Sequence, residues 1–435
     1  MGGLLVSAVV AIPASAAGGF GEPVVVGAGP VVVGAGWASP VAALDAHGNH
    51  ALAWTDGKRV HVARRTAGGT WTTQTISPPA DQMPDLQLVV TRGGDTIAAW
   101  TETYADGNVK GGVPDRFLAA IARPGQPFGG PHVIAKGPRA DSALPRMAAL
   151  ADGRVVLVWR AARWPSGGEL RLAFRRPGEP FGRSRRLRHD GIAPAVVATS
   201  DGGAVLTWAL PGRYRAPRVL RAARLPAHGH RVGRSFQLSA SALEGARLAA
   251  GADNVVVASW ASRHRPVGIL AAQLTPQRGP VRILSPQRPQ ATGATVALGP
   301  EGAVLAAFPA LTSNAPGCAC AGVGQWAASG TAAGGFAAPV PLTPAPPAVG
   351  LARPTILPTG EALAVWSQTA LRVGAPSSDV LVASRPAGSS SFAVETLGSG
   401  RGSSAAVSLA QAAGHVLVAW PALGPNGGLD VTERQ

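Results

Sequence analysis

The stretch DGRVVLVW at residues 152–159 and its counterpart DGGAVLTW at residues 201–208 decide the fold, because one pattern recurs along the whole chain. In each copy a turn residue is followed six residues later by an aromatic residue, while the distance between successive aromatic residues varies. The pairs are Gly48/Trp54, Gly94/Trp100, Gly153/Trp159, Gly202/Trp208, Asn254/Trp260, Gly302/Phe308, Gly360/Trp366 and Gly414/Trp420. A hairpin of constant length inside a repeat of variable length is typical of β-propeller blades.

Each copy of the pattern predicts part of a four-stranded unit. Gly reaches positive φ without steric cost, and Asn is the next best residue there, so both suit the tight turn between two strands. The β-rich runs before and after the turn, such as 195–199 and 204–208, predict two strands, which we call A and B. Strand C follows, for example at 60–64, and a Gly/Pro turn leads to strand D, which usually opens with an aromatic residue such as Trp71 or Phe181.

The two ends of the chain indicate how the repeats close into a ring. Residues 20–26 look like a strand D with no A, B or C before it, whereas the last repeat stops after its strand C at 430–432. We therefore expect an all-β fold, a single eight-bladed propeller over 17–435 that is closed by strands from both termini. A seven-bladed ring with one decayed repeat is the alternative, since the sixth repeat has Phe308 in place of Trp and an irregular strand C.

The N-terminal segment predicts export. Residues 4–12 are apolar but too few to span a bilayer, and residues 14–16 match the small residues of a cleavage site, although no basic residue precedes the apolar run. We expect residues 1–16 to be a signal peptide and the mature protein to be secreted or associated with the cell surface. No later run is long and apolar enough to predict a membrane helix, and we expect a monomer.

Two cysteines lie close together, at Cys318 and Cys320. In an exported protein such a pair is expected to be oxidised, although a disulfide between residues i and i+2 closes a small, strained ring. A Cys-x-Cys redox or metal site is the second interpretation, but no His or further Cys lies in register to complete a zinc site. We therefore favour a loop staple and predict no metal site and no cofactor.

The charge of the chain favours anionic partners. The formal net charge is +16, and only three of the 39 basic residues are Lys. Outside the cell a basic protein meets acidic polysaccharides, cell-wall polymers and anionic lipid headgroups, whereas nucleic acid is not expected as a partner there. A chain rich in Arg and Ala with little Lys is also what a GC-rich genome produces, so a purely compositional origin of the charge stays open.

Position within the repeat separates two groups of arginines. Five lie at the end of strand C, where repetition around the ring predicts a structural role at the edge of a neighbouring blade: Arg65, Arg123, Arg176, Arg224 and Arg385. Others lie in the variable loops between strands B and C, and such loops on a rigid scaffold are where binding residues gather. Because Arg suits carboxylate, sulfate and phosphate groups, we predict that this face binds an anionic glycan, a cell-wall polymer or a protein partner. The candidate residues are Arg160, Arg163, Trp164, Arg213, Tyr214, Arg215, Arg263, His264 and Arg265. A solvated basic loop surface is the alternative.

The phrases at 152–159 and 201–208 resemble secreted bacterial β-propeller repeat proteins, broadly of the sialidase-like kind, over nearly the whole mature chain. The resemblance implies the fold and leaves one alternative function open, a glycoside hydrolase or lyase acting on an acidic polysaccharide. Its acid and base would come from the acidic residues of the second loop between strands B and C, where Glu102, Tyr104, Asp106 and Asp115 lie. Because no spacing makes this set specific, we predict non-catalytic binding and assign no catalytic residue.

Overall fold

The protein is described by a computed structural model that covers residues 19–27, 31, 39–80, 85–103, 114–136, 143–162, 168–210, 218–262, 268–285, 293–311, 323–343, 350–370, 377–401, 406–422 and 427–434. Within these residues the chain forms strands and turns, and the only helical elements are two short 3-10 turns, η1 (Ala252–Asn254) and η2 (Pro300–Gly302). The prediction of an all-β fold is confirmed.

The strands follow one another along the chain in antiparallel groups of four. The groups are β2 (Val41–Leu44), β3 (His50–Thr55), β4 (Val60–Arg65) and β5 (Thr72–Thr75); β6 (Leu86–Val90), β7 (Thr96–Thr103), β8 (Pro114–Ala122) and β9 (His132–Lys136); β10 (Ala143–Ala149), β11 (Val155–Ala162), β12 (Gly168–Arg175) and β13 (Arg185–Arg188); β14 (Ile192–Ala198), β15 (Ala204–Leu210), β16 (Arg218–Leu225) and β17 (Phe236–Ala242); β18 (Arg247–Ala250), β19 (Val256–Ser262), β20 (Gly268–Thr275) and β21 (Arg282–Ser285); β22 (Thr295–Leu298), β23 (Ala303–Leu311), β24 (Val323–Thr331) and β25 (Val340–Pro341); β26 (Arg353–Ile356), β27 (Ala362–Ala370), β28 (Ser377–Arg385) and β29 (Ala393–Arg401); and β30 (Ser408–Ala412), β31 (His415–Pro421) and β32 (Leu429–Arg434) with β1 (Val24–Val26). In each group the members stand in the order A, B, C and D of the repeat.

Two pairings join segments that are distant in the chain or belong to different groups. β1 lies antiparallel beside β32, with Val24 opposite Val431 and Val26 opposite Leu429, so the expected pairing of the N-terminal strand with the last strand is present. A single pair, Ala242 with Ser262, joins β17 to β19 and merges the fourth and fifth groups into one eight-stranded sheet.

The turn between strands A and B is the most regular part of the repeat. Its turn residue has positive φ in all eight copies, from +59° at Asn254 to +89° at Gly414. This left-handed conformation is why Gly recurs at the position and why Asn is the one replacement.

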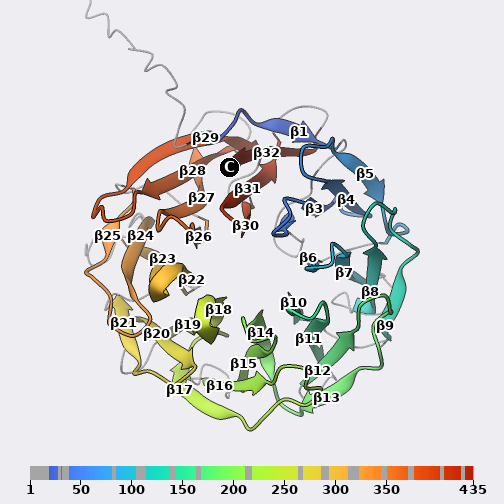
Figure 1. The fold of residues 1–435 in the computed structure, drawn as a ribbon, viewed down its shortest axis with the longest axis horizontal. Helices are drawn as coiled ribbons and strands as arrows, with labels where there is room; N and C mark the ends of the chain where they lie inside the picture. Colours follow the sequence, from blue (N-terminus) through green and yellow to red (C-terminus); the bar gives the residue numbers. More distant parts are fainter. Residues whose placement is uncertain are drawn as a thin grey trace, which may run out of the picture.

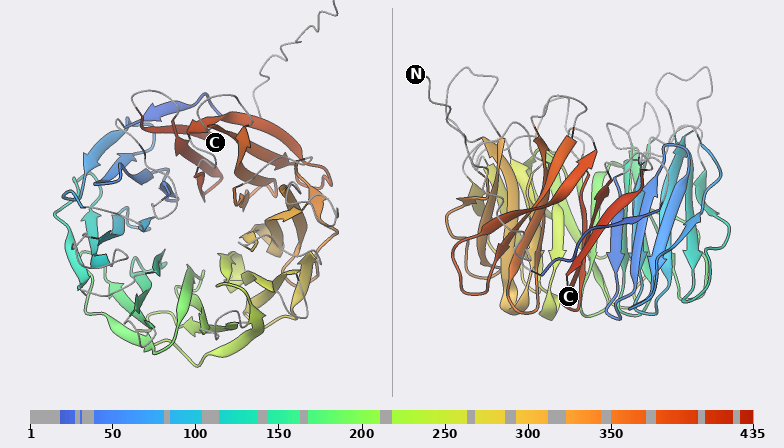
Figure 2. Two further views of the ribbon diagram at one scale, coloured as in Figure 1. Left: turned by 180° about the vertical axis from the view of Figure 1, so that it is seen from behind. Right: turned by 90° about the horizontal axis from the view of Figure 1, so that it is seen from above.

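The groups of strands surround a common axis, as Figure 1 shows, with strand A of each group innermost and strand D at the circumference. Seen from the side in Figure 2, the strands run along this axis. The molecule is therefore a β-propeller in its architecture.

The core lies between successive sheets and not inside any one of them. Every repeated aromatic residue is at most 3% exposed. Trp100, for example, belongs to a hydrophobic cluster with Ala51 and Val62 of the preceding sheet. Trp54 packs in the same way against Leu417 of the last sheet. The expectation that these aromatic residues are buried between neighbouring blades is confirmed.

Candidate functional site: an arginine-lined pocket

Three arginines occupy one register position in three of the innermost strands. Arg146 in β10 pairs with Val158, the residue before Trp159. Arg247 in β18 and Arg353 in β26 pair in the same way with the residue before their own aromatic residue. Because equal register means equal height along the axis, these side chains start from one level of the ring. We call Arg146, Arg247 and Arg353 the pocket arginines.

All three pocket arginines line one pocket of about 490 Å³. Its other walls come from the innermost strands β14, β22 and β30, through residues that include Ala195, Thr295 and Leu409. Since six of the innermost strands contribute to it, the pocket lies on the axis around which these strands gather in Figure 1. The pocket was not predicted from the sequence, because the predicted binding and structural arginines lie in the variable loops and in strand C, whereas the pocket arginines lie in strand A.

Two further charged residues reach the pocket. Arg218, at the start of β16, adds a fourth cation to its lining. Glu244, which precedes β18, is the one carboxylate among the described lining residues. The lining therefore carries an excess of positive charge, and a bound anion would reduce it.

The pocket arginines affect one another. Arg353 is exposed to the water of the pocket, but protein atoms surround its guanidinium group. This partial desolvation and the charge of Arg247 lower the pKa of Arg353 to about 10. For half-buried Arg146, desolvation and the charges of Arg247 and Arg353 lower the pKa to about 10, although Asp85 raises it in part. Arg146 and Arg353 stay protonated at neutral pH, because a pKa of about 10 is well above 7.

The described residues provide the pocket arginines with few partners. Arg146 donates one hydrogen bond from Nη1 to the carbonyl of Pro145, at 2.9 Å. Within the described part of the chain none of the three forms an ion pair with a carboxylate. Glu244 only partly offsets the desolvation that lowers the pKa of Arg247. Guanidinium groups with free N–H donors in a partly desolvated pocket can bind a carboxylate, a sulfate or a phosphate group.

None of the candidate residues predicted from sequence is among the described residues that line this pocket. Of that set only Arg160 lies in the described part of the chain, at the outer end of β11, where it is half-buried and packs closely against Gly168 of β12. It does not line the central pocket. The others lie outside the described residues, and so do Cys318 and Cys320: Arg163, Trp164, Arg213, Tyr214, Arg215, Arg263, His264 and Arg265.

Of the residues suggested for catalysis, the structure describes the side chain of Glu102 alone. Glu102 lies in strand β7 and not in a loop, where it is fully buried and accepts a hydrogen bond of 3.0 Å from the indole of Trp100. The prediction that Glu102 lies in a loop was wrong, because β7 extends to Thr103 and therefore includes Glu102. The loop after β7 begins later than the repeat suggested. Tyr104 and Asp106 lie outside the described residues, and the side chain of Asp115 is not described either.

The arginines of strand C hold neighbouring sheets together, but the shared position differs from the predicted one. Four arginines pair with the first register position of strand B, four residues before the aromatic residue: Arg65, Arg175, Arg385 and Arg434. We call these the clasp arginines. Of the five predicted, Arg65 and Arg385 belong to this group, Arg123 reaches the carbonyl of Gly178 in the next group, and Arg224 binds Asp201 within its own group.

Each clasp arginine contacts the sheet before its own. Arg65 pairs with Glu433, and Arg385 donates to the hydroxyl of Ser329 at 2.6 Å. Arg175, only 1% exposed, pairs with Asp95 at 2.6 Å. Arg434 donates a hydrogen bond from Nη1 to Oε1 of Glu361 at 2.8 Å and another from Nη2 to Oε2 at 2.6 Å. These contacts explain the recurrence of Arg at the position as a structural feature of the repeat.

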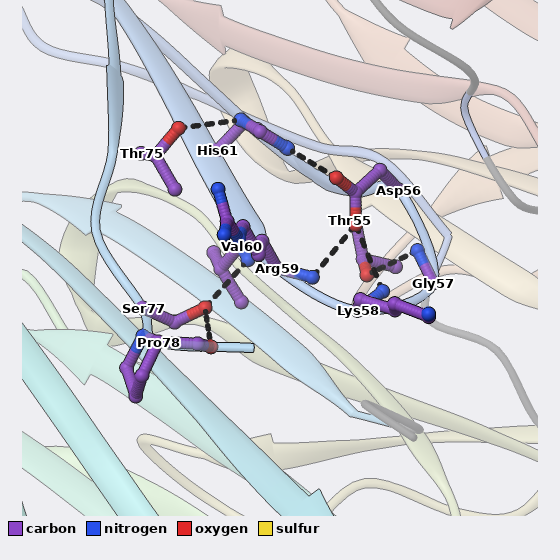
Figure 3. Close-up of polar contacts among 10 residues, drawn as sticks. All are labelled: Thr55, Asp56, Gly57, Lys58, Arg59, Val60, His61, Thr75, Ser77 and Pro78. Atoms are coloured by element: carbon purple, nitrogen blue, oxygen red, sulfur yellow. Dashed lines mark hydrogen bonds and ion pairs between the residues drawn. The ribbon is translucent and has the colours of Figure 1, made fainter. Parts of the chain in front are cut away.

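A second polar group lies at the turn between β3 and β4 (Figure 3). The Asp56 carboxylate lies 3.0 Å from Nε2 of His61, whose Nδ1 lies 3.1 Å from the hydroxyl of Thr75. The same carboxylate accepts backbone N–H groups of Lys58 and Arg59. Burial alone would raise the pKa of Asp56, but these hydrogen bonds outweigh it and lower the pKa. The carboxylate thus organises its own turn, and this explains the group without a ligand.

Comparison with known proteins shows the fold alone. No protein-family model and no curated protein match the sequence. The solved Dos1 propeller matches with a TM-score of 0.58 at 10% identity, over 95% of this chain and 94% of that one. A mutant of the NanB sialidase from Streptococcus pneumoniae matches with a TM-score of 0.45 at 9% identity, over 89% and 90% of the two chains. An α-L-arabinanase from Penicillium chrysogenum matches with a TM-score of 0.40 at 11% identity, over 68% and 93%. The likeness to the Dos1 propeller supports the β-propeller fold, and at such low identity it carries no activity over to this protein.

Proposed function

We propose that this protein is an exported, non-catalytic β-propeller that binds an anionic sugar polymer, one acidic group of which enters the central pocket. The observation that carries the proposal is the set of pocket arginines, three cations at one level of the ring that share a pocket with a single described carboxylate, Glu244. Bringing like charges together in a partly desolvated site costs free energy, and a bound carboxylate or sulfate would recover it.

The proposal includes eight blades closed by strands from both termini. Three features support it. The described strands fall into eight groups of four, and the eight-stranded sheet divides at the single pair Ala242 and Ser262. β1 completes the last group by pairing with β32. The cluster around Trp54 joins the last sheet to the first.

Binding is favoured over hydrolysis by the composition of the pocket. Hydrolysis of a glycosidic bond usually needs two carboxyl groups on either side of it. Among the described residues that line the pocket, Glu244 is the one carboxylic acid. The alternative of a glycoside hydrolase or lyase would require a second acid from residues outside the described part of the chain.

Export remains part of the proposal and rests on the sequence of residues 1–16, which lie outside the described residues. In the part that the structure describes, no helix has the length and apolarity needed to cross a membrane. Expression of the full chain in a bacterial host, followed by mass spectrometry of the N-terminus, tests export. A mature protein that begins at Ala17 would support the proposal, and a retained Met1 in the cytoplasm would contradict it.

The binding proposal is tested by calorimetric titration of the protein with trigalacturonate, a short acidic oligosaccharide. Loss of one charge-assisted contact in Arg353→Gln is expected to weaken binding by about tenfold to hundredfold. Gln87→Ala is the matched control, because Gln87 holds the same register position in β6 and does not line the pocket. Equal affinities of wild type and Arg353→Gln, or no binding by wild type, would refute the role of the pocket.

A further inference from the structure

A second basic surface lies on the outside of the ring, away from the central pocket. Strand β13 is the outer edge strand of its sheet and carries Arg185, Arg186 and Arg188, all exposed, with exposed Arg183 just before it. Two more exposed arginines, Arg231 and Arg234, precede β17, the strand D of the next group. We call these six residues the outer-edge patch.

The outer-edge patch is a local feature and not a general property of strands D. β5, the equivalent strand of the first group, has the sequence TTQT and no charge. β21 carries one arginine, Arg282, and β17 carries none. If Arg on β13 served only to block edge-to-edge pairing, β5 and β17 would need the same protection, and neither carries a charged residue.

The arginines of the patch are mostly unpaired. Arg186 lies 4.0 Å from Glu169, whose carboxylate is already bound by Arg171. The side chains of the other five form no hydrogen bond and no ion pair with any residue that the structure describes. Their charge is therefore available to an external partner.

A hollow of about 230 Å³ opens beside the patch. Arg183 and Arg185 line it together with Arg176, and Glu179 is the one carboxylate among its described lining residues. Phe174 and His230 form another part of its wall, with their rings edge to face and 5.7 Å apart. The hollow combines three guanidinium groups from different positions of the chain, a geometry that suits one tetrahedral or planar anionic group.

We propose that the outer-edge patch binds an acidic polysaccharide, with one sulfate or carboxylate group in the hollow and the next groups along β13. A bulge in β13 places Arg185 and Arg188 opposite Leu172 and Leu170 of β12, so these two arginines belong to one face of the sheet and present a row of charges to an extended chain. A single-stranded nucleic acid is less well matched, since such binding relies on aromatic faces for the bases. The phenylalanines that lie beside the patch, Phe174, Phe181 and Phe236, are all half-buried.

Retention on immobilised heparin, eluted with a salt gradient, tests this proposal. The patch variant combines Arg183→Gln, Arg185→Gln and Arg188→Gln. The matched control combines Arg59→Gln, Arg92→Gln and Arg282→Gln, which removes the same charge at exposed positions of other sheets. We expect the patch variant to elute at clearly lower salt, with about tenfold weaker affinity at low salt, and the control to elute close to wild type.

Other outcomes would overturn the proposal. Equal losses in both triple variants would mean that heparin senses only the net charge. A patch variant that elutes with wild type would make these arginines a solvated surface. Loss of retention on immobilised oligothymidylate with heparin retention intact would assign the patch to nucleic acid. Calorimetric titration of the patch variant with trigalacturonate reports the central pocket separately, because none of its three substituted residues lines that pocket. Wild-type affinity for trigalacturonate together with reduced heparin retention is expected, so failure of the outer site and failure of the central pocket are separable.

Discussion

The clasp arginines and the pocket arginines are the same residue type at repeated positions of the same fold, but their surroundings are opposite. Arg175 and Arg434 reach carboxylates of the preceding sheet, at Asp95 and Glu361. Arg247 and Arg353 line one pocket, where desolvation lowers the pKa of both and the charge of Arg247 further lowers that of Arg353. Repetition of a charged residue therefore does not by itself distinguish a structural role from a binding role. The presence or absence of a matching carboxylate does.

The two groups should respond to mutation with opposite signs. A paired buried arginine stabilises the fold relative to the variant that leaves its carboxylate alone. An unpaired arginine among like charges destabilises the fold when no ligand is bound. The following predictions test this difference, beginning with the largest effect.

Arg175→Gln is expected to lower the free energy of unfolding by about 3 kcal/mol, because it leaves Asp95 without its partner in a poorly hydrated place. Denaturation with urea, followed by tryptophan fluorescence, measures the change. The double variant Arg175→Met with Asp95→Asn should recover much of the loss, since neither charge is then unpaired. A single variant as stable as wild type would remove the distinction between the two groups.

Arg434→Gln should cost about 1 kcal/mol, less than Arg175→Gln because Arg434 and Glu361 are more exposed, at 16% and 18%. Arg434 belongs to β32, the strand that pairs with β1, and the ion pair joins this strand to the sheet before it. Adding 0.5 M salt should reduce the difference between wild type and variant, because partly exposed charges are screened. A difference that salt does not change would argue against an electrostatic clasp.

Arg247→Gln should raise the free energy of unfolding in the absence of ligand, by about 0.5 kcal/mol, because it removes a cation that lowers the pKa of Arg146 and Arg353. Thermal unfolding without added anions provides the measurement, and Gln87→Ala is the control. A destabilised variant would place Arg247 among the structural arginines.

The clasp at Arg65 and Glu433 should be sensitive to acid through His50, whose Nε2 lies 3.8 Å from Glu433. Burial lowers the pKa of His50 below 6.5, as do the charges of Arg65 and His415, while Glu433 and Asp45 raise it in part. In the unfolded chain His50 has its ordinary pKa and binds a proton more readily than in the folded protein. Wild type should therefore lose stability as the pH falls from 7 to about 5. His50→Gln should lose less over the same range. Parallel curves for the two proteins would exclude His50 as the cause.

The repeat predicted the fold well because its signal is local. The turn at Gly153 and the burial of Trp159 depend on backbone conformation and packing that one repeat already specifies. The pocket was harder to predict, since Arg146, Arg247 and Arg353 lie in alternate repeats and become neighbours only when the ring forms. A signal was nevertheless present: each lies thirteen residues ahead of its aromatic residue. The prediction for the end of strand C named Arg176, which is one residue too late. The neighbouring Arg175 occupies the clasp position and forms the ion pair with Asp95.

The most direct test of the pocket is a crystal structure of the protein grown with trigalacturonate. We expect one carboxylate of the oligosaccharide on the ring axis, within hydrogen-bonding distance of the guanidinium groups of Arg146, Arg247 and Arg353. We also expect that the same experiment with the Arg146→Gln, Arg247→Gln and Arg353→Gln triple variant leaves the pocket without the sugar. An oligosaccharide bound only elsewhere on wild type, with the pocket arginines paired to carboxylates of the protein itself, would contradict the account.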